Sequence, residues 1–172
     1  MANAEERIRR LEQLREKARE LAQRIGAPAD SLPPFGDSRD GYYVDYDGLY
    51  RWIARERGEE RDHRLTLDED EVLYWIFEQI TFGMGTEYEV EHRVPNQDSR
   101  RMLFGKQIEL MTKLNPNWGE RRKQELDAVL AQNPYDDRRG LTPAQLLAKT
   151  KALNLHTPSE SADMIRRDRD SR

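Results

Sequence analysis

Near the start of the chain, apolar residues recur every three or four positions, at Ile8, Leu11, Leu14, Ala18, Leu21 and Ile25. This spacing places them on one side of a helix. Asn3 and Glu6 have the spacing of a capping box, and Gly26 with Pro28 favours a helix end. We therefore predict an amphipathic helix over residues 4–25. Its apolar stripe could form a coiled-coil seam, but docking on the chain's own core is the preferred interpretation.

Residues 30–41 are rich in Pro, Gly, Asp and Ser, a composition typical of a loop. Within it, Leu32 and Phe35 are the expected anchors into the core. The hydrophobic pattern then changes, and β-forming residues predict three strands, over 42–46, 49–57 and about 60–65. This region is the predicted sheet.

The first two of these strands are separated by Asp47 and Gly48. This dipeptide is typical of a two-residue type I′ turn because it accepts positive φ. Side chains alternate between the faces of a strand, so we expect the face that holds Tyr50, Trp52 and Ala54 to point toward the core.

Helical spacing returns after the strands. Thr66 and Glu69 repeat the capping-box pattern, and Gly83 and Gly85 predict a kink or a short break farther along. Two more helices are predicted, over 98–114 and from Asn115-Pro116 to about residue 132. Their expected inward residues are Leu103, Phe104, Ile108, Met111, Leu114, Trp118, Arg122, Leu126, Val129 and Leu130.

The order of elements predicts an α+β fold: an N-terminal helix, a three-stranded antiparallel sheet, and three to four helices packed on one face. We expect one domain over residues 1–137. Residues 138–172 would form an extension, with a short helix over about 142–155 and then a polar tail.

Charge changes this picture in one respect. The formal charge is −4, but residues 30–93 hold 17 acidic and 7 basic groups, a balance of −10. The segments 1–29, 94–137 and 138–172 carry +2, 0 and +4. An acidic segment repels nucleic-acid phosphate and attracts basic surfaces, so we expect a basic protein partner and no nucleic acid.

Several classes of protein are excluded by what the sequence lacks. No stretch approaches the roughly 18 to 20 apolar residues that span a bilayer, and the N-terminus has no apolar signal region. We therefore expect a cytoplasmic protein without membrane contact. The absence of cysteine excludes disulfides, thiolate metal sites and cysteine nucleophiles.

The residues that could perform catalysis do not converge. His63, His92 and His156 lie far apart and form no HExxH pattern. The consecutive carboxylates of residues 68–71 fan out around a helix axis, and stabilisation of the helix dipole explains them better than acid–base chemistry. We expect no catalytic residue, no metal and no cofactor, and so no enzyme.

What remains is a surface of acids and aromatic rings on the hairpin and on the start of the next helix. Rings supply contact area and carboxylates steer association, a mixture that suits a basic protein partner. The candidate partner-binding residues are Tyr43, Asp45, Tyr46, Asp47, Glu56, Glu59, Glu60, Asp62, Asp68 and Asp70. The alternative is that many of these rings form the sheet core.

Four runs of residues resemble immunity protein 63 of bacterial polymorphic toxin systems. They are LPPFGDSRD at 32–40, ERG at 56–58, LYWIF at 73–77 and RRMLFGKQIEL at 100–110. They come in the same order as in that family, and the resemblance covers about residues 10–136. Residues 138–172 depart from the family pattern.

The resemblance implies an antidote that binds and neutralises a cognate toxin by occlusion, without catalytic residues of its own. The acidic region 40–71 would then cover a basic cleft, such as that of a nuclease toxin. Two other functions remain open: an adaptor that uses helix 4–25 as a coiled coil, and a hydrolase that uses the carboxylates of residues 68–71.

Overall fold

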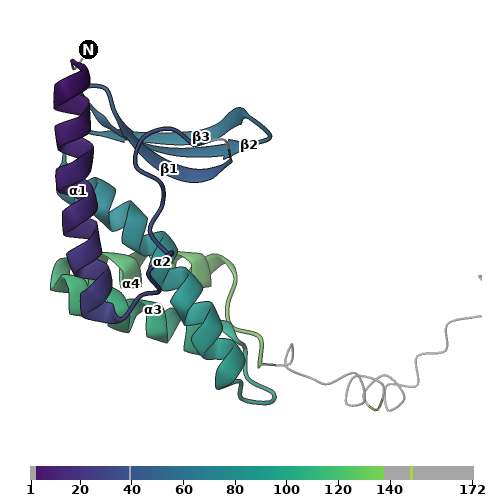
Figure 1. Ribbon diagram of the computed structural model, residues 1–172. Helices are drawn as coiled ribbons and strands as arrows, with labels where there is room; N and C mark the ends of the chain where they lie inside the picture. Colours follow the sequence, from purple (N-terminus) through teal and green to yellow (C-terminus); the bar gives the residue numbers. More distant parts are fainter. Residues whose placement is uncertain (1–2, 39, 138–147, 149–172) are drawn as a thin grey trace, which may run out of the picture.

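The computed structural model describes residues 3–38, 40–137 and 148, and within them an α+β architecture (Figure 1). The elements follow in the order α1 Ala4–Ile25, β1 Gly41–Tyr46, β2 Tyr50–Glu56, β3 Glu59–Thr66, α2 Glu69–Glu91, α3 Arg100–Leu114 and α4 Pro116–Gln132. The predicted fold class is confirmed. The helix expected over 142–155 and the polar tail lie outside the described residues, apart from residue 148, and the division at residue 137 stays a prediction.

Helix α1 has the predicted bounds and the predicted cap, because the Asn3 side chain accepts a hydrogen bond of 2.7 Å from the backbone N–H of Glu6. Gly26 ends the helix with a positive φ of 69°. Most of its apolar stripe is buried against the chain's own core, with Leu14 and Ala18 fully covered, but Ile8 near its start is 54% exposed. The docked interpretation of this helix is therefore confirmed.

The three strands form an antiparallel sheet of order β1-β2-β3. Tyr46 pairs directly with Tyr50, so three residues rather than two connect β1 and β2, and the predicted two-residue turn is wrong. Only Gly48 in this connection has a positive φ, whereas a type I′ turn needs two such residues. The strand β3 lies at the edge of the sheet, and a parallel bridge between Phe35 and Val44 covers part of the opposite edge.

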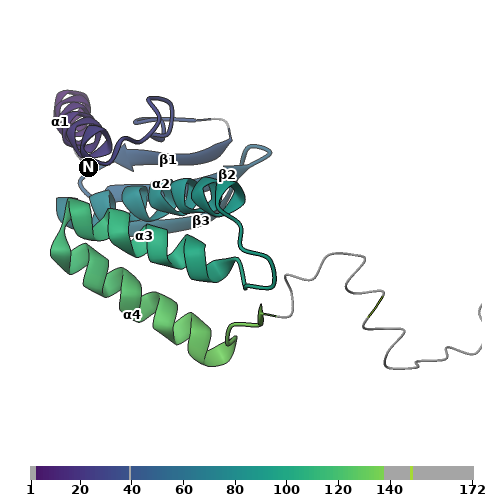
Figure 2. The same ribbon diagram turned by 90° about the horizontal axis from the view of Figure 1, so that it is seen from below.

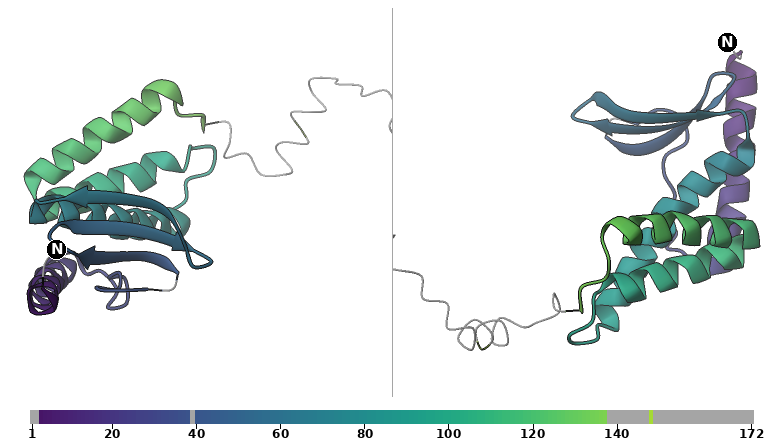
Figure 3. Two further views of the ribbon diagram at one scale, coloured as in Figure 1. Left: turned by 90° about the horizontal axis from the view of Figure 1, so that it is seen from above. Right: turned by 180° about the vertical axis from the view of Figure 1, so that it is seen from behind.

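Helices α2, α3 and α4 lie on one side of the sheet, whereas α1 runs past the sheet beside β1 and continues to α3 (Figures 1, 2 and 3). Val44, Tyr46, Tyr50 and Trp52 join the main core on the helix-facing side, as expected for Tyr50 and Trp52. Ile53 was expected to face away from the core but is only 1% exposed. It pairs with the buried Tyr43 on the outer face of the sheet.

Helix α2 differs from the prediction at its start and in its middle. Thr66 still belongs to β3, and the cap is Asp68, whose side chain accepts from the backbone N–H of Asp70 at 2.9 Å. The helix runs through Gly83 and Gly85 without a break. A Cβ at position 85 would lie 2.9 Å from the Leu103 carbonyl oxygen, so this glycine permits close helix packing and does not end the helix.

Helices α3 and α4 pack in turn on α2, with α3 between α2 and α4 (Figure 2). Asn115 and Pro116 begin α4 as predicted, and the Asn115 side chain accepts from the backbone N–H of Asn117 at 3.0 Å. α3 begins at Arg100, two residues later than predicted, because Asp98 lies before it and accepts from the Arg100 backbone N–H. Val129, expected to point inward, is 46% exposed.

Candidate partner-binding surface

The two tyrosines of the predicted partner-binding set lie inside the protein. Tyr46 belongs to the main core beneath the sheet and is 8% exposed. Tyr43 lies on the outer face, 2% exposed, with the Arg55 guanidinium 5.0 Å above its ring and donating to its hydroxyl at 2.8 Å. Neither ring is available to a partner, because β1 uses both of its faces for packing.

Most carboxylates of the hairpin are paired with arginines. Asp45 accepts from Arg7 at 2.8 Å, and the Asp47 side chain lies 3.4 Å from Arg51. The other ion pairs are Glu60 with Arg55 and Arg51, and Glu56 and Glu59 with the shared Arg61. The hairpin is therefore less negative than its count of carboxylates indicates. The side chain of Asp62 lies outside the described part of the structure.

Two predicted carboxylates keep an unbalanced charge at the start of α2. Asp68 caps the helix, and Asp70 accepts a hydrogen bond of 2.9 Å from the Trp118 indole N–H. Within the described residues, neither has a lysine or arginine at ion-pair distance, whereas Glu69 pairs with Lys17 and Glu71 with Arg121. Both Asp68 and Asp70 are exposed.

Two exposed leucines precede these aspartates in the sequence. Leu65, near the end of β3, is 49% exposed, and Leu67, between β3 and α2, is 79% exposed. We call Leu65, Leu67, Asp68 and Asp70 the α2 cap patch. The leucines were not identified from the sequence, because an alternating strand pattern assigns Leu65 to a face without showing whether that face is covered.

A second group missed by the sequence lies between the sheet and the helices. Tyr42 and Trp52 stack at 5.2 Å, and together with Trp75 and Phe82 of α2 they line a hollow of about 240 Å³. Tyr42 and Phe82 are 45% and 44% exposed. The rings come from three elements, and pattern reasoning cannot bring such distant positions together.

A chain of ion pairs borders this hollow and joins α2 to α4. Arg122 donates to Glu78 and to Glu125, and Arg64 of β3 also donates to Glu78. Next to it, the Arg121 guanidinium binds Glu71 through two nitrogens and holds the pKa of that carboxyl below its usual value. The network fixes α4 on α2 and leaves the hollow close to neutral.

The carboxylates of residues 68–71 do not form a catalytic pair. Each has a different partner, and Glu69 faces Tyr50, whose pKa is raised to about 12 by burial and by the hydrogen bond to Glu69. Among residues 3–38 and 40–137, no cluster of three or more His, Asp or Glu side chains could hold a metal ion. In the same residues, no helix has the length and apolar character of a membrane span.

Comparison with known proteins gives one match. Residues 46–128 match the family model of immunity protein 63. The match begins at the last residue of β1 and covers β2, β3, α2, α3 and most of α4, so it includes the α2 cap patch but not α1 or the loop with Leu32 and Phe35. Neither the curated proteins nor the solved structures gave a match. The match over residues 46–128 supports the resemblance to the immunity protein 63 family.

Proposed function

We propose that this protein binds its cognate toxin directly and neutralises it by covering the surface that the toxin needs. A general role in immunity is supported by the match to the family model of immunity protein 63. The match over residues 46–128 is the observation that carries the proposal, because it spans β2, β3, the α2 cap patch, α2, α3 and most of α4.

We propose that neutralisation needs no chemistry by the immunity protein itself. In support, the carboxylates of residues 68–71 are each held by a different group, namely a backbone N–H, Tyr50, Trp118 and Arg121. Acid–base catalysis needs groups that converge on one reacting atom. These residues suit a protein that acts by tight binding alone better than they suit a hydrolase.

The toxin surface that we propose is basic. The α2 cap patch offers two unbalanced carboxylates within a few residues of two exposed leucines in the sequence, so it combines a charge that steers association with apolar area that a partner can bury. The exposed hairpin carboxylates Asp47, Glu56, Glu59 and Glu60 would lie at the border, where paired charges contribute little. A nuclease toxin has the kind of basic cleft that this surface fits.

Co-expression tests this function. The toxin domain is sought in the neighbouring reading frames and is then produced in bacterial cells with this protein, or with a control version shortened to residues 1–66, which lacks α2, α3 and α4. We expect the full chain alone to restore growth and to elute with the toxin in gel filtration. Continued toxicity in the presence of the folded full chain would disprove the proposal.

The adaptor alternative has lost its main support. A coiled coil would need a free apolar stripe on α1, yet Leu11, Leu14 and Ala18 are buried in the protein's own core. A partner helix could reach that stripe only if α1 left the core.

A further inference from the structure

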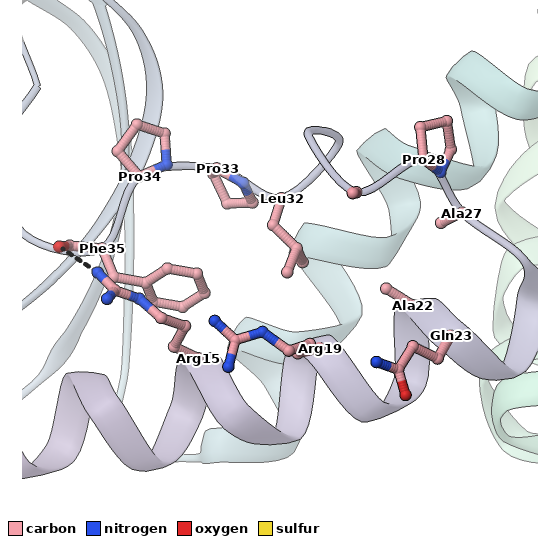
Figure 4. Close-up of a pocket in the computed structure, with 11 residues that line it drawn as sticks. Arg15, Arg19, Ala22, Gln23, Ala27, Pro28, Leu32, Pro33, Pro34 and Phe35 are labelled. Carbon is pink, nitrogen blue, oxygen red and sulfur yellow. Dashed lines mark hydrogen bonds between the residues drawn. The ribbon is translucent and has the colours of Figure 1, made fainter.

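A pocket of about 520 Å³ lies between α1 and the loop that follows it, and none of the functions above uses it (Figure 4). Arg15 and Arg19 rise from one side of α1 toward this loop, and Leu32 points back toward them. The pocket lies before residue 46, outside the part of the chain that matches the family model.

The charge of the pocket is positive. Its lining includes Arg15 and Arg19 and no carboxylate. Arg19 donates at 2.6 Å to Glu16, which lies outside the lining, and both of these side chains are more than half exposed. Arg15 donates only to the Phe35 carbonyl oxygen, at a long 3.4 Å, and its guanidinium lies 5.4 Å from the Phe35 ring. Within the described chain, no carboxylate balances Arg15.

The rest of the wall is largely apolar. Ala22, Ala27, Leu32 and three prolines face the arginines, and a proline has no backbone N–H to offer to a ligand. Two guanidinium groups opposite such a wall suit an anion at the end of an apolar stem, because the stem can pack while the anion accepts hydrogen bonds. A carboxylate is the anion that proteins supply for this purpose.

We propose that this pocket, which we call the Arg15 pocket, receives an acidic side chain of the cognate toxin. The inference rests on the proposed function. The positive charge of the pocket favours an anion as its ligand. Because Arg15 and Arg19 are exposed, this anion is assigned to the toxin and not to a free small molecule. Exposed ion pairs hold a free small acid only weakly, so that it binds at high concentration alone, whereas a residue already held by the rest of an interface adds its contact at a high effective concentration.

Such a contact would give the protein a means of choosing its toxin. The α2 cap patch attracts any basic surface, but the Arg15 pocket accepts only a partner with an acid at the matching position. The two sites differ in charge and lie on different elements, so a toxin must satisfy both of them. The residues outside the family match would then determine specificity, and those within it would supply general binding.

Charge-removing variants of the full chain test the pocket. Arg15→Gln with Arg19→Gln should weaken toxin binding about tenfold or more, because charge-assisted hydrogen bonds are lost. Arg15→Lys with Arg19→Lys should recover part of the affinity, since the charge returns without the planar fork.

The matched control is Arg9→Gln, at an exposed position on the same helix, and its affinity should stay within about twofold of the unsubstituted chain. Circular dichroism and thermal melting confirm that each variant is folded.

A second arm needs no toxin. Full-length labelled protein is titrated in NMR with 3-phenylpropionate, a carboxylate on an apolar stem, and with the matching amide. We expect the acid alone to shift the signals of the Arg15 and Arg19 guanidinium groups and of Leu32. Absence of such shifts, or equal shifts with the amide, would overturn the assignment of the pocket to a carboxylate.

The outcomes separate this inference from the proposed function. If the unsubstituted chain does not bind the toxin, both fail. If it binds and the glutamine variants bind equally well, the proposed function stands and the Arg15 pocket does not contact the toxin. If the probe binds the unsubstituted chain but not the glutamine variants, while toxin affinity is unchanged, the pocket serves a free small acid and the inference is again overturned.

Discussion

At the scale of single residues, the two glycines of α2 make a matched pair. Gly85→Ala places a Cβ 2.9 Å from the Leu103 carbonyl oxygen, so α3 has to shift, and we expect a loss of about 1–3 kcal/mol in the free energy of unfolding. Gly83→Ala meets no atom within 4 Å and should gain roughly 0.5–1 kcal/mol, because alanine restricts the unfolded chain. Urea titration measures both changes. Equal effects at the two positions would contradict the packing role of Gly85.

Asp98 gives a prediction about pH. Its carboxylate is 4% exposed and accepts hydrogen bonds from the Arg100 guanidinium and from the backbone N–H groups of Arg100 and Asp136. The Arg100 guanidinium holds the pKa of Asp98 well below its usual range of about 4. Asp98→Asn should therefore cost about 2–3 kcal/mol at pH 7.

The sign of the pH dependence follows from the lowered pKa of Asp98. A depressed folded-state pKa contributes stability above the unfolded value and loses it as the pH falls. The difference in the free energy of unfolding between the unsubstituted chain and Asp98→Asn should therefore shrink as the pH falls below about 4. Urea titrations at a series of pH values measure this difference. Asp127→Asn, at an exposed ion pair with Lys123, is the control and should cost less than about 1 kcal/mol. If the difference in the free energy of unfolding stayed constant down to pH 2, the assigned role of Asp98 would be contradicted.

At the scale of elements, α1 offers a comparison between two positions of its apolar stripe. Leu14 is fully buried and Ile8 is 54% exposed on the same helix. We expect Leu14→Ala to lower the free energy of unfolding by about 2–5 kcal/mol, because it leaves a cavity, and Ile8→Ala to change it by less than about 0.5 kcal/mol. If both substitutions had small effects in urea titration, α1 would not be docked in solution.

The elements that the sequence predicted well are those set by local signals. The bounds of α1 and the start of α4 follow from caps and spacing within a few residues, and such signals need no knowledge of the rest of the fold. The errors arose where a distant segment decides. The local pattern predicts a helix cap at Thr66, but this residue belongs to β3 because it pairs with Tyr50. The pattern also predicts a break near Gly85, but this glycine lies inside α2 because α3 packs closely against it.

The candidate site was predictable only in part, for the same reason. The sequence indicated an acidic hairpin, but the partner of Asp45 is Arg7, 38 residues earlier, and the ring of Tyr43 is covered by Arg55. Charge counted along a segment cannot include such cross-chain pairs. Asp68 and Asp70 remain candidates because each accepts from an uncharged N–H donor, which leaves its charge unbalanced. The donor is the Asp70 backbone for Asp68 and the Trp118 indole for Asp70.

At the scale of the whole molecule, the α2 cap patch predicts how the toxin is attracted. Asp68→Asn with Asp70→Asn removes two charges and keeps the hydrogen bonds, because asparagine also caps helices and accepts from N–H groups. We expect a slower association rate with the toxin and a weaker dependence of that rate on salt, measured by stopped-flow fluorescence.

The control for this pair changes the net charge by the same amount elsewhere. Glu87→Gln with Glu91→Gln acts on exposed carboxylates near the other end of α2. The association rate should change less for this control, because exposed charges act only over about a Debye length. Equal slowing by both pairs would mean that net charge, and not the α2 cap patch, guides the toxin.

The edge strand β3 has a further consequence when many copies of the protein are close together. Its outer side offers unpaired backbone groups, the template from which sheets grow between copies. Along this border the chain places Glu59, Glu60, Arg61 and Arg64, all exposed, so a second molecule would have to strip water from several ionised groups to add itself there. The exposed charges of β3 therefore also protect the protein against fibre formation.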